Sequence, residues 1–137
     1  MQFRGLDAQA ARAFAQRWLP AWTGNRPADL AAFYTDDVFY SDPAIPNGVR
    51  GRDALLAYFT KLLGRNPAWV WTHRGSIPMP DGFLNEWHAS IPVGATTVEV
   101  DGVCTVQIRG GLIYRNRVYF DRSRLLLAIA AAEKGGK

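Results

Sequence analysis

Residues 96–109 constrain the fold most strongly, because apolar and polar side chains alternate along the whole segment. One face carries Val98, Val100, Gly102, Cys104, Val106 and Ile108. Successive side chains of a strand point to opposite faces, so this pattern predicts a long strand with one buried face. The pair Gly110-Gly111 follows it, and two glycines between alternating segments favour a hairpin.

Three further segments alternate in the same way and complete a predicted four-stranded antiparallel meander. They are residues 68–77, 83–92 and 112–120, and Pro78 to Gly82 reads as the first hairpin connection. The expected inward residues are Trp69, Trp71, His73 and Ile77, then Phe83, Asn85, Trp87, Ala89 and Ile91, and finally Leu112, Tyr114, Asn116, Val118 and Phe120. A sheet with one apolar face needs helices to cover it.

The N-terminal part of the chain is predicted to supply those helices. Apolar residues recur at helical spacing in segments 7–24, 28–35 and 52–64, a strand is expected at 37–42, and 43–51 reads as a turn or a short strand. Pro20 predicts a kink or an early end of the first helix, and Asp121 can cap a last helix. The prediction is an α+β fold with N-terminal helices packed on a strongly curved, mainly antiparallel sheet. It is expected to be one domain spanning 1–137, with a core at about 7–130 and a frayed tail at 133–137.

Composition favours a cytoplasmic protein. Cys104 is the only cysteine of the chain, so an intramolecular disulfide is excluded and a reducing compartment is favoured. No apolar run is long enough to span a membrane, and residues 1–7 lack the layout of a signal peptide. Neither membrane nor nucleic acid is a predicted partner. A weaker alternative is nucleic-acid binding through the arginines between Arg109 and Arg124, although they form no dense stripe.

Short motifs along the chain resemble the nuclear transport factor 2-like superfamily, particularly its SnoaL-like, ketosteroid isomerase-like and limonene epoxide hydrolase-like branches. The matching pieces are a long first helix ending near a glycine, Asp36-Asp37-Val38, Asp42-Pro43, Gly51-Arg52-Asp53-Ala54 and Tyr119-Phe120-Asp121. The resemblance covers nearly the whole chain. It implies a cone-shaped roll with an apolar cavity at its open end, and a homodimer formed through the outer face of the sheet.

The resemblance carries over only part of the reaction sites known in that superfamily. The general base of ketosteroid isomerase-like proteins matches Asp42, whereas the two oxyanion donors fall at Trp18 and near Cys104. The positions of the epoxide hydrolase-like pattern fall at Tyr40 and Asp42 and near Trp87, Ala89 and Val118. The resemblance therefore implies a SnoaL-like pocket with a different interior, in a group that includes polyketide cyclases and dehydratases.

Asp42 is the candidate general base, because strand alternation puts it on one face with Val38 and Tyr40. A carboxylate on an apolar face loses hydration, which would raise its pKa and suit a base near neutral pH. Tyr40, Asn116 or His73 is expected to hold a substrate oxygen, with Tyr40 and His73 as the predicted catalytic partners. The alternative for Asp42 is an Asx-type turn residue that binds the backbone of the connection after Pro43.

The predicted ligand-binding residues share the inward faces. They are Trp18, Trp22, Trp69, Trp71, Trp87, Cys104, Asn116, Val118 and Phe120, with the indole N–H groups as candidate donors. His88 falls on the opposite strand face from Trp87, so the two histidines do not predict a metal site. No phosphate-binding glycine motif or cofactor motif is present in the sequence, and no cofactor is predicted.

These observations predict a SnoaL-like protein that binds an apolar or aromatic small molecule in a tryptophan-rich cavity. If the protein is an enzyme, cofactor-free acid–base chemistry through Asp42 is expected: isomerisation, dehydration or cyclisation. The alternative is a non-catalytic ligand-binding or interaction module of the same fold, whose cavity is filled by tryptophan side chains.

Overall fold

The computed structural model describes residues 7–135, and its elements follow the predicted order. The helices are α1 (Ala8–Trp18), the 3-10 helix η1 (Leu19–Trp22), α2 (Pro27–Ala31), α3 (Arg52–Arg65) and α4 (Ser123–Gly135). The strands are β1 (Tyr34–Asp42), β2 (Ile45–Arg50), β3 (Val70–Met79), β4 (Gly82–Val93), β5 (Thr96–Arg109) and β6 (Leu112–Tyr119). The predictions about residues 1–6 and 136–137 lie outside the described residues. Glu133 to Gly135, predicted to be frayed, form the end of α4.

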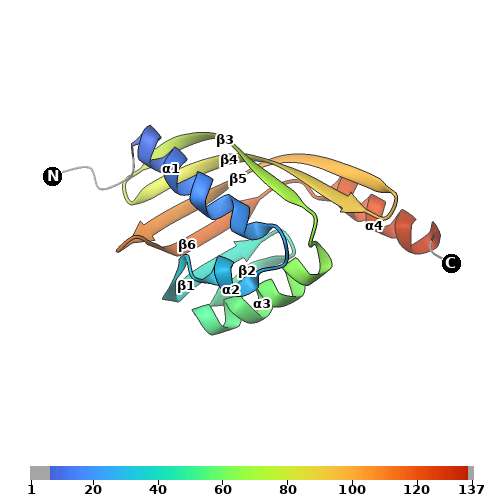
Figure 1. Ribbon diagram of the computed structural model, residues 1–137, viewed down its shortest axis with the longest axis horizontal. Helices are drawn as coiled ribbons and strands as arrows, with labels where there is room; N and C mark the ends of the chain where they lie inside the picture. The colour runs from blue at the N-terminus through green and yellow to red at the C-terminus, as the bar shows by residue number, and fades with distance from the viewer. Residues whose placement is uncertain (1–6, 136–137) are drawn as a thin grey trace.

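The strands form one curved, unclosed sheet in the order β2-β1-β6-β5-β4-β3 (Figure 1). The meander from β3 to β6 is antiparallel, as predicted. β1 joins it by pairing parallel to β6, with Tyr40 opposite Asn116. Local alternation does not predict this junction, since it gives the faces of each strand but not which distant strands pair.

The first helix ends early, as Pro20 predicts. Asp7 caps α1 by accepting a hydrogen bond from the Ala10 N–H at 2.8 Å, and the α-helix stops at Trp18 before the 3-10 turn that contains Pro20. The second predicted helix also ends early, at Ala31, and β1 begins at Tyr34 rather than at residue 37. Tyr34 is aligned with Ile113 of β6, so sheet pairing overrides the helical spacing of these residues.

The inner face of the sheet agrees with the alternation in β4 and β5 but shifts in β3 and β6. The register of β3 against β4 slips between His73 and Gly75, and Ile77, predicted to face inward, is 50% exposed. A second shift occurs where Gln107 pairs with Arg115. Ile113 is therefore buried, whereas Leu112 and Tyr114, predicted to be inward, are partly exposed. One extra residue in a strand moves every later side chain to the other face.

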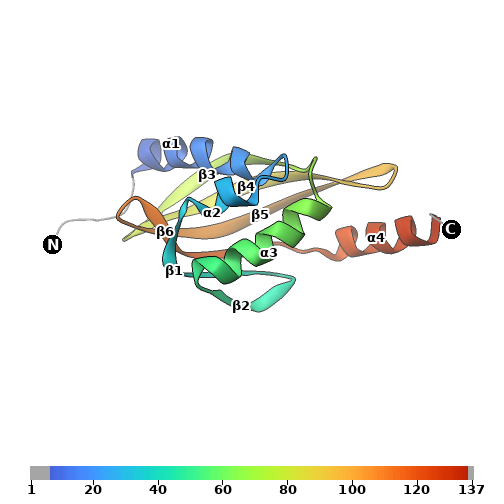
Figure 2. The same cartoon turned by 60° about the horizontal axis from the view of Figure 1, so that its bottom comes forward.

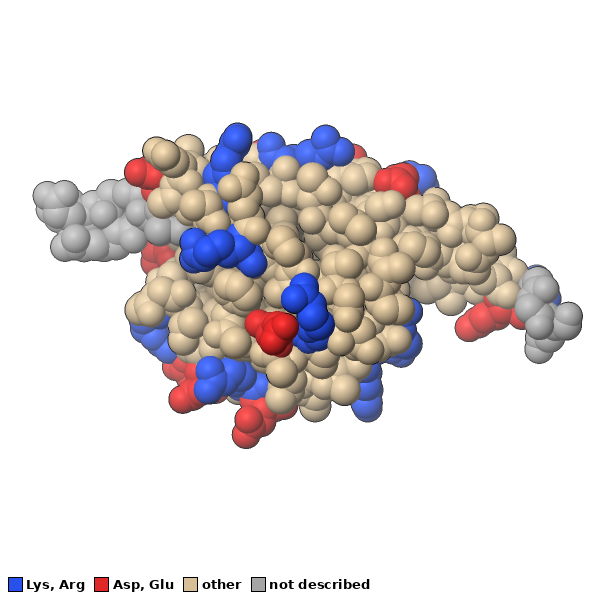
Figure 3. All heavy atoms as spheres, viewed as in Figure 1, with Lys and Arg blue, Asp and Glu red and all other residues tan. Residues whose placement is uncertain are grey.

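The core lies between the inner face of the sheet and the N-terminal helices. α1 packs on β3 and β4, α3 packs on β1, and α4 extends beyond them toward the C-terminus (Figure 2). On the face drawn in Figure 3, basic and acidic side chains are interspersed rather than gathered into a stripe. Within the described residues, no helix combines the length and the hydropathy required of a membrane span.

Candidate ligand-binding cavity

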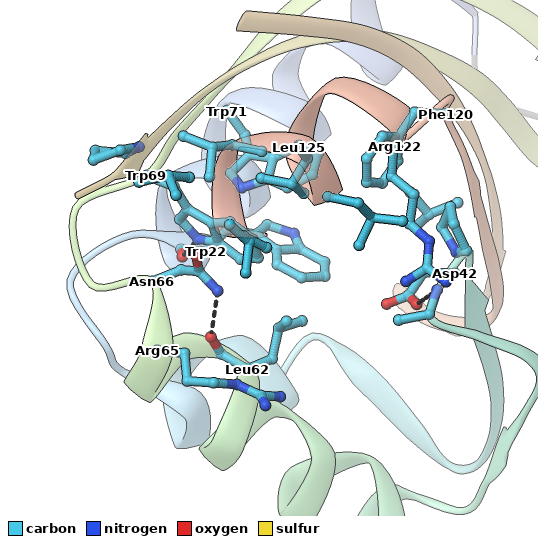
Figure 4. Close-up of a pocket in the computed structure, with 18 of the residues that line it drawn as sticks. Trp22, Asp42, Leu62, Arg65, Asn66, Trp69, Trp71, Phe120, Arg122 and Leu125 are labelled. Carbon is cyan, nitrogen blue, oxygen red and sulfur yellow. Dashed lines mark hydrogen bonds between the residues drawn. The ribbon is translucent and has the colours of Figure 1, made fainter. Parts of the chain in front are cut away.

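A cavity of about 580 Å³ opens between the sheet, η1, α3 and α4. Its volume falls within the range of sites that hold small organic molecules. In Figure 4, Trp22, Trp69 and Trp71 lie on one side of it, and Asp42, Phe120 and Arg122 lie on the other. Leu62 and Arg65 of α3 and the following Asn66 also line it. The cavity is therefore open space with a mostly apolar wall and a few polar groups.

Asp42 lies at the end of β1, beside the register shift that separates it from Tyr40 in the pairing with β2. It is buried and lines the cavity. Its Oδ1 accepts the backbone N–H groups of Ala44 at 2.9 Å and Ile45 at 3.1 Å. Its Oδ2 accepts the hydroxyl groups of Tyr40 at 2.9 Å and Tyr58 at 2.7 Å. Oδ1 of Asp42 thus binds the backbone of the turn, as the Asx-turn alternative predicts. Oδ2 instead accepts hydrogen bonds from two tyrosine hydroxyl groups.

The two phenols differ in how accessible they are. Tyr40 is buried (1% exposed), whereas Tyr58 is partly exposed and reaches Asp42 from α3. Burial raises the pKa of both tyrosines, and the neighbouring Asp42 raises each pKa further. Both hydroxyl groups therefore stay protonated near neutral pH and act as hydrogen-bond donors rather than as bases.

Aromatic rings form a continuous wall along the cavity. The ring centroids of Trp22 and Trp71 are 5.7 Å apart, those of Trp71 and Trp87 are 4.4 Å apart, and those of Trp87 and Phe120 are 5.5 Å apart. Trp18 and Trp69 complete the set of five tryptophans that line it. Tilted and edge-to-face pairs of this kind pack favourably and hold one another in place.

The N–H groups of Trp22, Trp69 and Trp71 are not available to a ligand in the cavity, unlike the sequence-based expectation. Nε1 of Trp69 donates to the backbone carbonyl of Trp22 at 2.6 Å. Nε1 of Trp22 and of Trp71 is buried, with no hydrogen-bond partner among residues 7–135. These tryptophans therefore offer ring carbons to a ligand, which favours apolar contact over hydrogen bonding.

The remaining predicted site residues divide into two groups. Cys104, Val118 and Phe120 line the cavity. Burial raises the pKa of the Cys104 thiol to about 12, so the thiol stays protonated, in line with its predicted lack of reactivity. His73 and Asn116 lie on the inner side of the sheet but do not line the cavity.

His73 and Asn116 are held by other side chains. Nδ1 of His73 is 2.6 Å from Oδ1 of Asn85, and its Nε2 is 3.3 Å from the Ser76 hydroxyl. Asn116 accepts the Tyr34 hydroxyl at 2.8 Å and donates to the Thr105 carbonyl at 2.8 Å. Both predicted positions thus have their hydrogen bonds inside the structure, away from the cavity.

His88 lies on the outer face, as its alternation indicates, between two acids of β5. Its Nδ1 is 2.8 Å from Asp101 and its Nε2 is 2.6 Å from Glu99. The hydrogen bonds to Asp101 and then to Glu99 raise the pKa of His88. Within residues 7–135, no group of three or more potential ligands is arranged to hold a metal ion.

Several cavity residues were missed in the sequence. Tyr58 lies three residues after Leu55 and four before Leu62, and this helical spacing could have placed it on the inner side of α3. Arg65, Arg122 and Leu125 also line the cavity. Arg122 lies just before α4 and Leu125 lies in it. No local sequence pattern predicts that this part of the chain lies beside the cavity.

Comparisons with known proteins agree with this architecture. The family pattern of the SnoaL-like domain matches residues 15–116. A putative SnoaL-like polyketide cyclase from Jannaschia sp. CCS1 superposes with a TM-score of 0.76 at 15% identity, covering 96% of this chain and 99% of that one. A hypothetical protein with a ketosteroid isomerase-like fold from Catenulispora acidiphila, in complex with trimethylamine, gives 0.75 at 22% identity, with coverages of 85% and 92%.

A third structure, RV0760c from Mycobacterium tuberculosis in complex with estradiol-17β-hemisuccinate, has a TM-score of 0.67 at 23% identity and coverages of 84% and 95%. No curated protein matches the chain. The solved structures share the fold, and the family pattern spans well over half of the sequence. The curved sheet, the helices across it and this match together make the chain a member of the SnoaL-like domain family.

Proposed function

We propose that the protein binds an apolar, ring-bearing small molecule in the cavity between the sheet and α3. The observation that carries this proposal is the open volume of about 580 Å³ beside a wall of five tryptophans. Indole rings that filled the core would leave no such space. Burying a flat apolar ligand against these rings removes water from apolar surface at a gain of about 25 cal/mol per Å².

Asp42 is the polar feature that such a ligand would meet. Two backbone N–H groups hold its Oδ1 in place, so the carboxylate is fixed in position before a ligand arrives. Its Oδ2 accepts a hydrogen bond from the partly exposed Tyr58, so a ligand that displaces this hydroxyl can contact Oδ2. A ligand hydroxyl or amine could replace the Tyr58 hydroxyl on Oδ2, and Tyr58 would then be free to donate to a ligand oxygen.

This exchange also favours a second candidate function, cofactor-free acid–base catalysis. With Tyr58 turned to the ligand oxygen, Oδ2 of Asp42 could take a proton from the neighbouring carbon, while the protonated phenol stabilises the enolate oxygen. Tyr40 would remain as the second donor to Oδ2. Isomerisation, dehydration and cyclisation of a ketone all begin with such a proton transfer.

Two solved structures of the same fold support this proposal. One is in complex with a steroid hemisuccinate and another with trimethylamine, so the same fold accommodates small organic molecules in other proteins. The fold also motivates the proposal of a homodimer through the outer face of the sheet in the cytoplasm. Val70 and Tyr119 on that face are 49% and 50% exposed, and sedimentation equilibrium would detect the dimer.

Titration of the intrinsic tryptophan fluorescence with aromatic ketones tests ligand binding. Saturable quenching is expected, weakened in Asp42→Asn and unchanged in Asp36→Asn, a control in the same strand that does not line the cavity. Exchange of the ketone α-protons for deuterium, followed by NMR, tests catalysis and should vanish in Asp42→Asn. Absence of quenching by every ketone would instead support the non-catalytic interaction module, whereas quenching without exchange would leave a binding protein.

A further inference from the structure

Two arginines reach the cavity from opposite sides. Arg65 comes from the last turn of α3, and Arg122 comes from the segment between β6 and α4 (Figure 4). Within residues 7–135, neither guanidinium group forms an ion pair with an acidic side chain: the arginines that do are Arg26, Arg52 and Arg109. Two cations without acidic partners therefore border a mostly apolar cavity.

Both charges act on the polar end of the cavity. In Figure 4, Arg122 lies on the same side of the cavity as Asp42, and Arg65 lies across from it. Both positive charges lower the pKa of Tyr58 against the larger effects of burial and of Asp42. Asp42 lies at the same end, and four donors already satisfy its carboxylate. Asp42, Arg65 and Arg122 together carry a formal charge of +1.

The other acid of the lining, Glu133, does not neutralise this excess. It follows Ser123, the first residue of α4, by ten positions, which corresponds to about 15 Å along the helix axis. Glu133 thus belongs to the far end of α4. Glu133 is therefore set apart from the N-terminal end of α4, which Arg122 precedes.

Helix stability does not explain the position of Arg122. The helix dipole is positive at the N-terminus and negative at the C-terminus, so a cation is unfavourable at the N-terminus and favourable at the C-terminus. Arg65 fits this rule at the end of α3. Arg122 breaks it, since it directly precedes the first residue of α4. Asp121 already caps the positive end of the helix by accepting the Ser123 N–H, so an anion bound beside Arg122 would balance the guanidinium.

We propose that the ligand of this cavity is a ring-bearing molecule with one carboxylate, which the positive charges of Arg65 and Arg122 attract while the rings pack against the tryptophans. This inference rests on the proposed binding function and adds the charge of the ligand. The carboxylate would lie at the polar end, and its electrostatic partners would be the two guanidinium groups rather than Asp42.

A matched pair of probes separates the charge of the ligand from its rings. Calorimetric titration with 1-naphthaleneacetate and with the neutral 1-naphthaleneacetamide compares a carboxylate with its amide on the same rings. The acetate is expected to bind the wild type more tightly, by about threefold to tenfold for each guanidinium contact that it gains. Binding of the acetate should weaken with added salt, and binding of the amide should not.

Two charge-removing variants locate the contacts, each with a control a few residues away in the chain. Arg122→Gln and Arg65→Gln should each weaken acetate binding severalfold and leave amide binding unchanged. Arg124→Gln and Lys61→Gln remove exposed charges that do not line the cavity, and both should bind like the wild type. Melting temperatures of all four variants check that each is folded.

Equal affinity for the two probes, or equal effects of Arg122→Gln and Arg124→Gln, would overturn the carboxylate assignment while leaving the binding function intact. If neither probe binds while the variants and the wild type are folded, the proposed binding function fails for such rings, and the carboxylate assignment fails with it. Tighter binding of the acetate that depends on both Arg65 and Arg122 supports the assignment.

Discussion

Gly102 is the position where one added methyl group should disturb the cavity most clearly. It pairs with Trp87 across β4 and β5. A Cβ at Gly102 would lie 2.4 Å from Cζ2 and 2.5 Å from Cη2 of the Trp87 ring, and 2.7 Å from the Tyr119 carbonyl oxygen. Ordinary carbon contacts are about 3.5–4.0 Å, so the ring would have to move by roughly 1 Å or more.

Trp87 has little freedom to make that movement. It is 2% exposed and packs between Trp71, at 4.4 Å between ring centroids, and Phe120, at 5.5 Å. The Tyr119 oxygen belongs to the backbone of the neighbouring strand and cannot yield alone. Overpacking of this kind costs about 1–3 kcal/mol, and we expect the upper part of that range for Gly102→Ala.

Thermal unfolding followed by circular dichroism measures this cost. For a chain of this length about 1 kcal/mol corresponds to roughly 3–5 °C, so a cost of about 2–3 kcal/mol in Gly102→Ala should lower the melting temperature by about 6–15 °C. Gly64→Ala is the matched control in α3, where the nearest atom to an added Cβ is Oδ1 of Asn25 at 4.0 Å. It should raise the melting temperature slightly, because alanine favours a helix over glycine. A Gly102→Ala protein that melts within about 1 °C of the wild type would refute the contact between Trp87 and Gly102.

The other predictions concern hydrogen bonds to charged groups. Tyr40→Phe should lower the free energy of unfolding by about 1.5–3 kcal/mol, since it removes a buried donor to Asp42. Tyr58→Phe should lower it by less than about 1 kcal/mol, because water can replace the hydroxyl of a partly exposed tyrosine. Urea denaturation of both variants measures the difference, and a larger loss for Tyr58→Phe would contradict the assigned burial. His88 has a raised pKa, so the stability that it contributes is fully present below its unfolded pKa of about 6.5 and is lost as the pH rises through the folded pKa. The difference in urea midpoint between the wild type and His88→Gln should therefore be larger at about pH 5.5 than at about pH 9, and a difference independent of pH would exclude the ion pairs with Asp101 and Glu99.

Much of the fold could be predicted because its signals are local. The alternation of residues 96–109 matches β5 at both ends, and Pro20 predicts the end of α1. Asp121 accepts the N–H and the hydroxyl of Ser123, which is consistent with its predicted capping role at α4. The burial of Val38, Tyr40 and Asp42 on one face of β1 also follows from alternation alone. Strand alternation and helix capping depend on residues within a few positions of each other, so both can be predicted from a short stretch of sequence.

The site depended on contacts that no local pattern contains. The hydroxyl of Tyr58 reaches Asp42 from another element, and Arg122 reaches the cavity only because the segment before α4 passes beside it. The register shifts in β3 and β6 turned Ile77 and Tyr114 away from their predicted faces. The sequence by itself therefore determined which side chains share a strand face or a helix side. The tertiary structure decided which of them meet around open space, because strand register and helix placement are set by packing across the whole sheet.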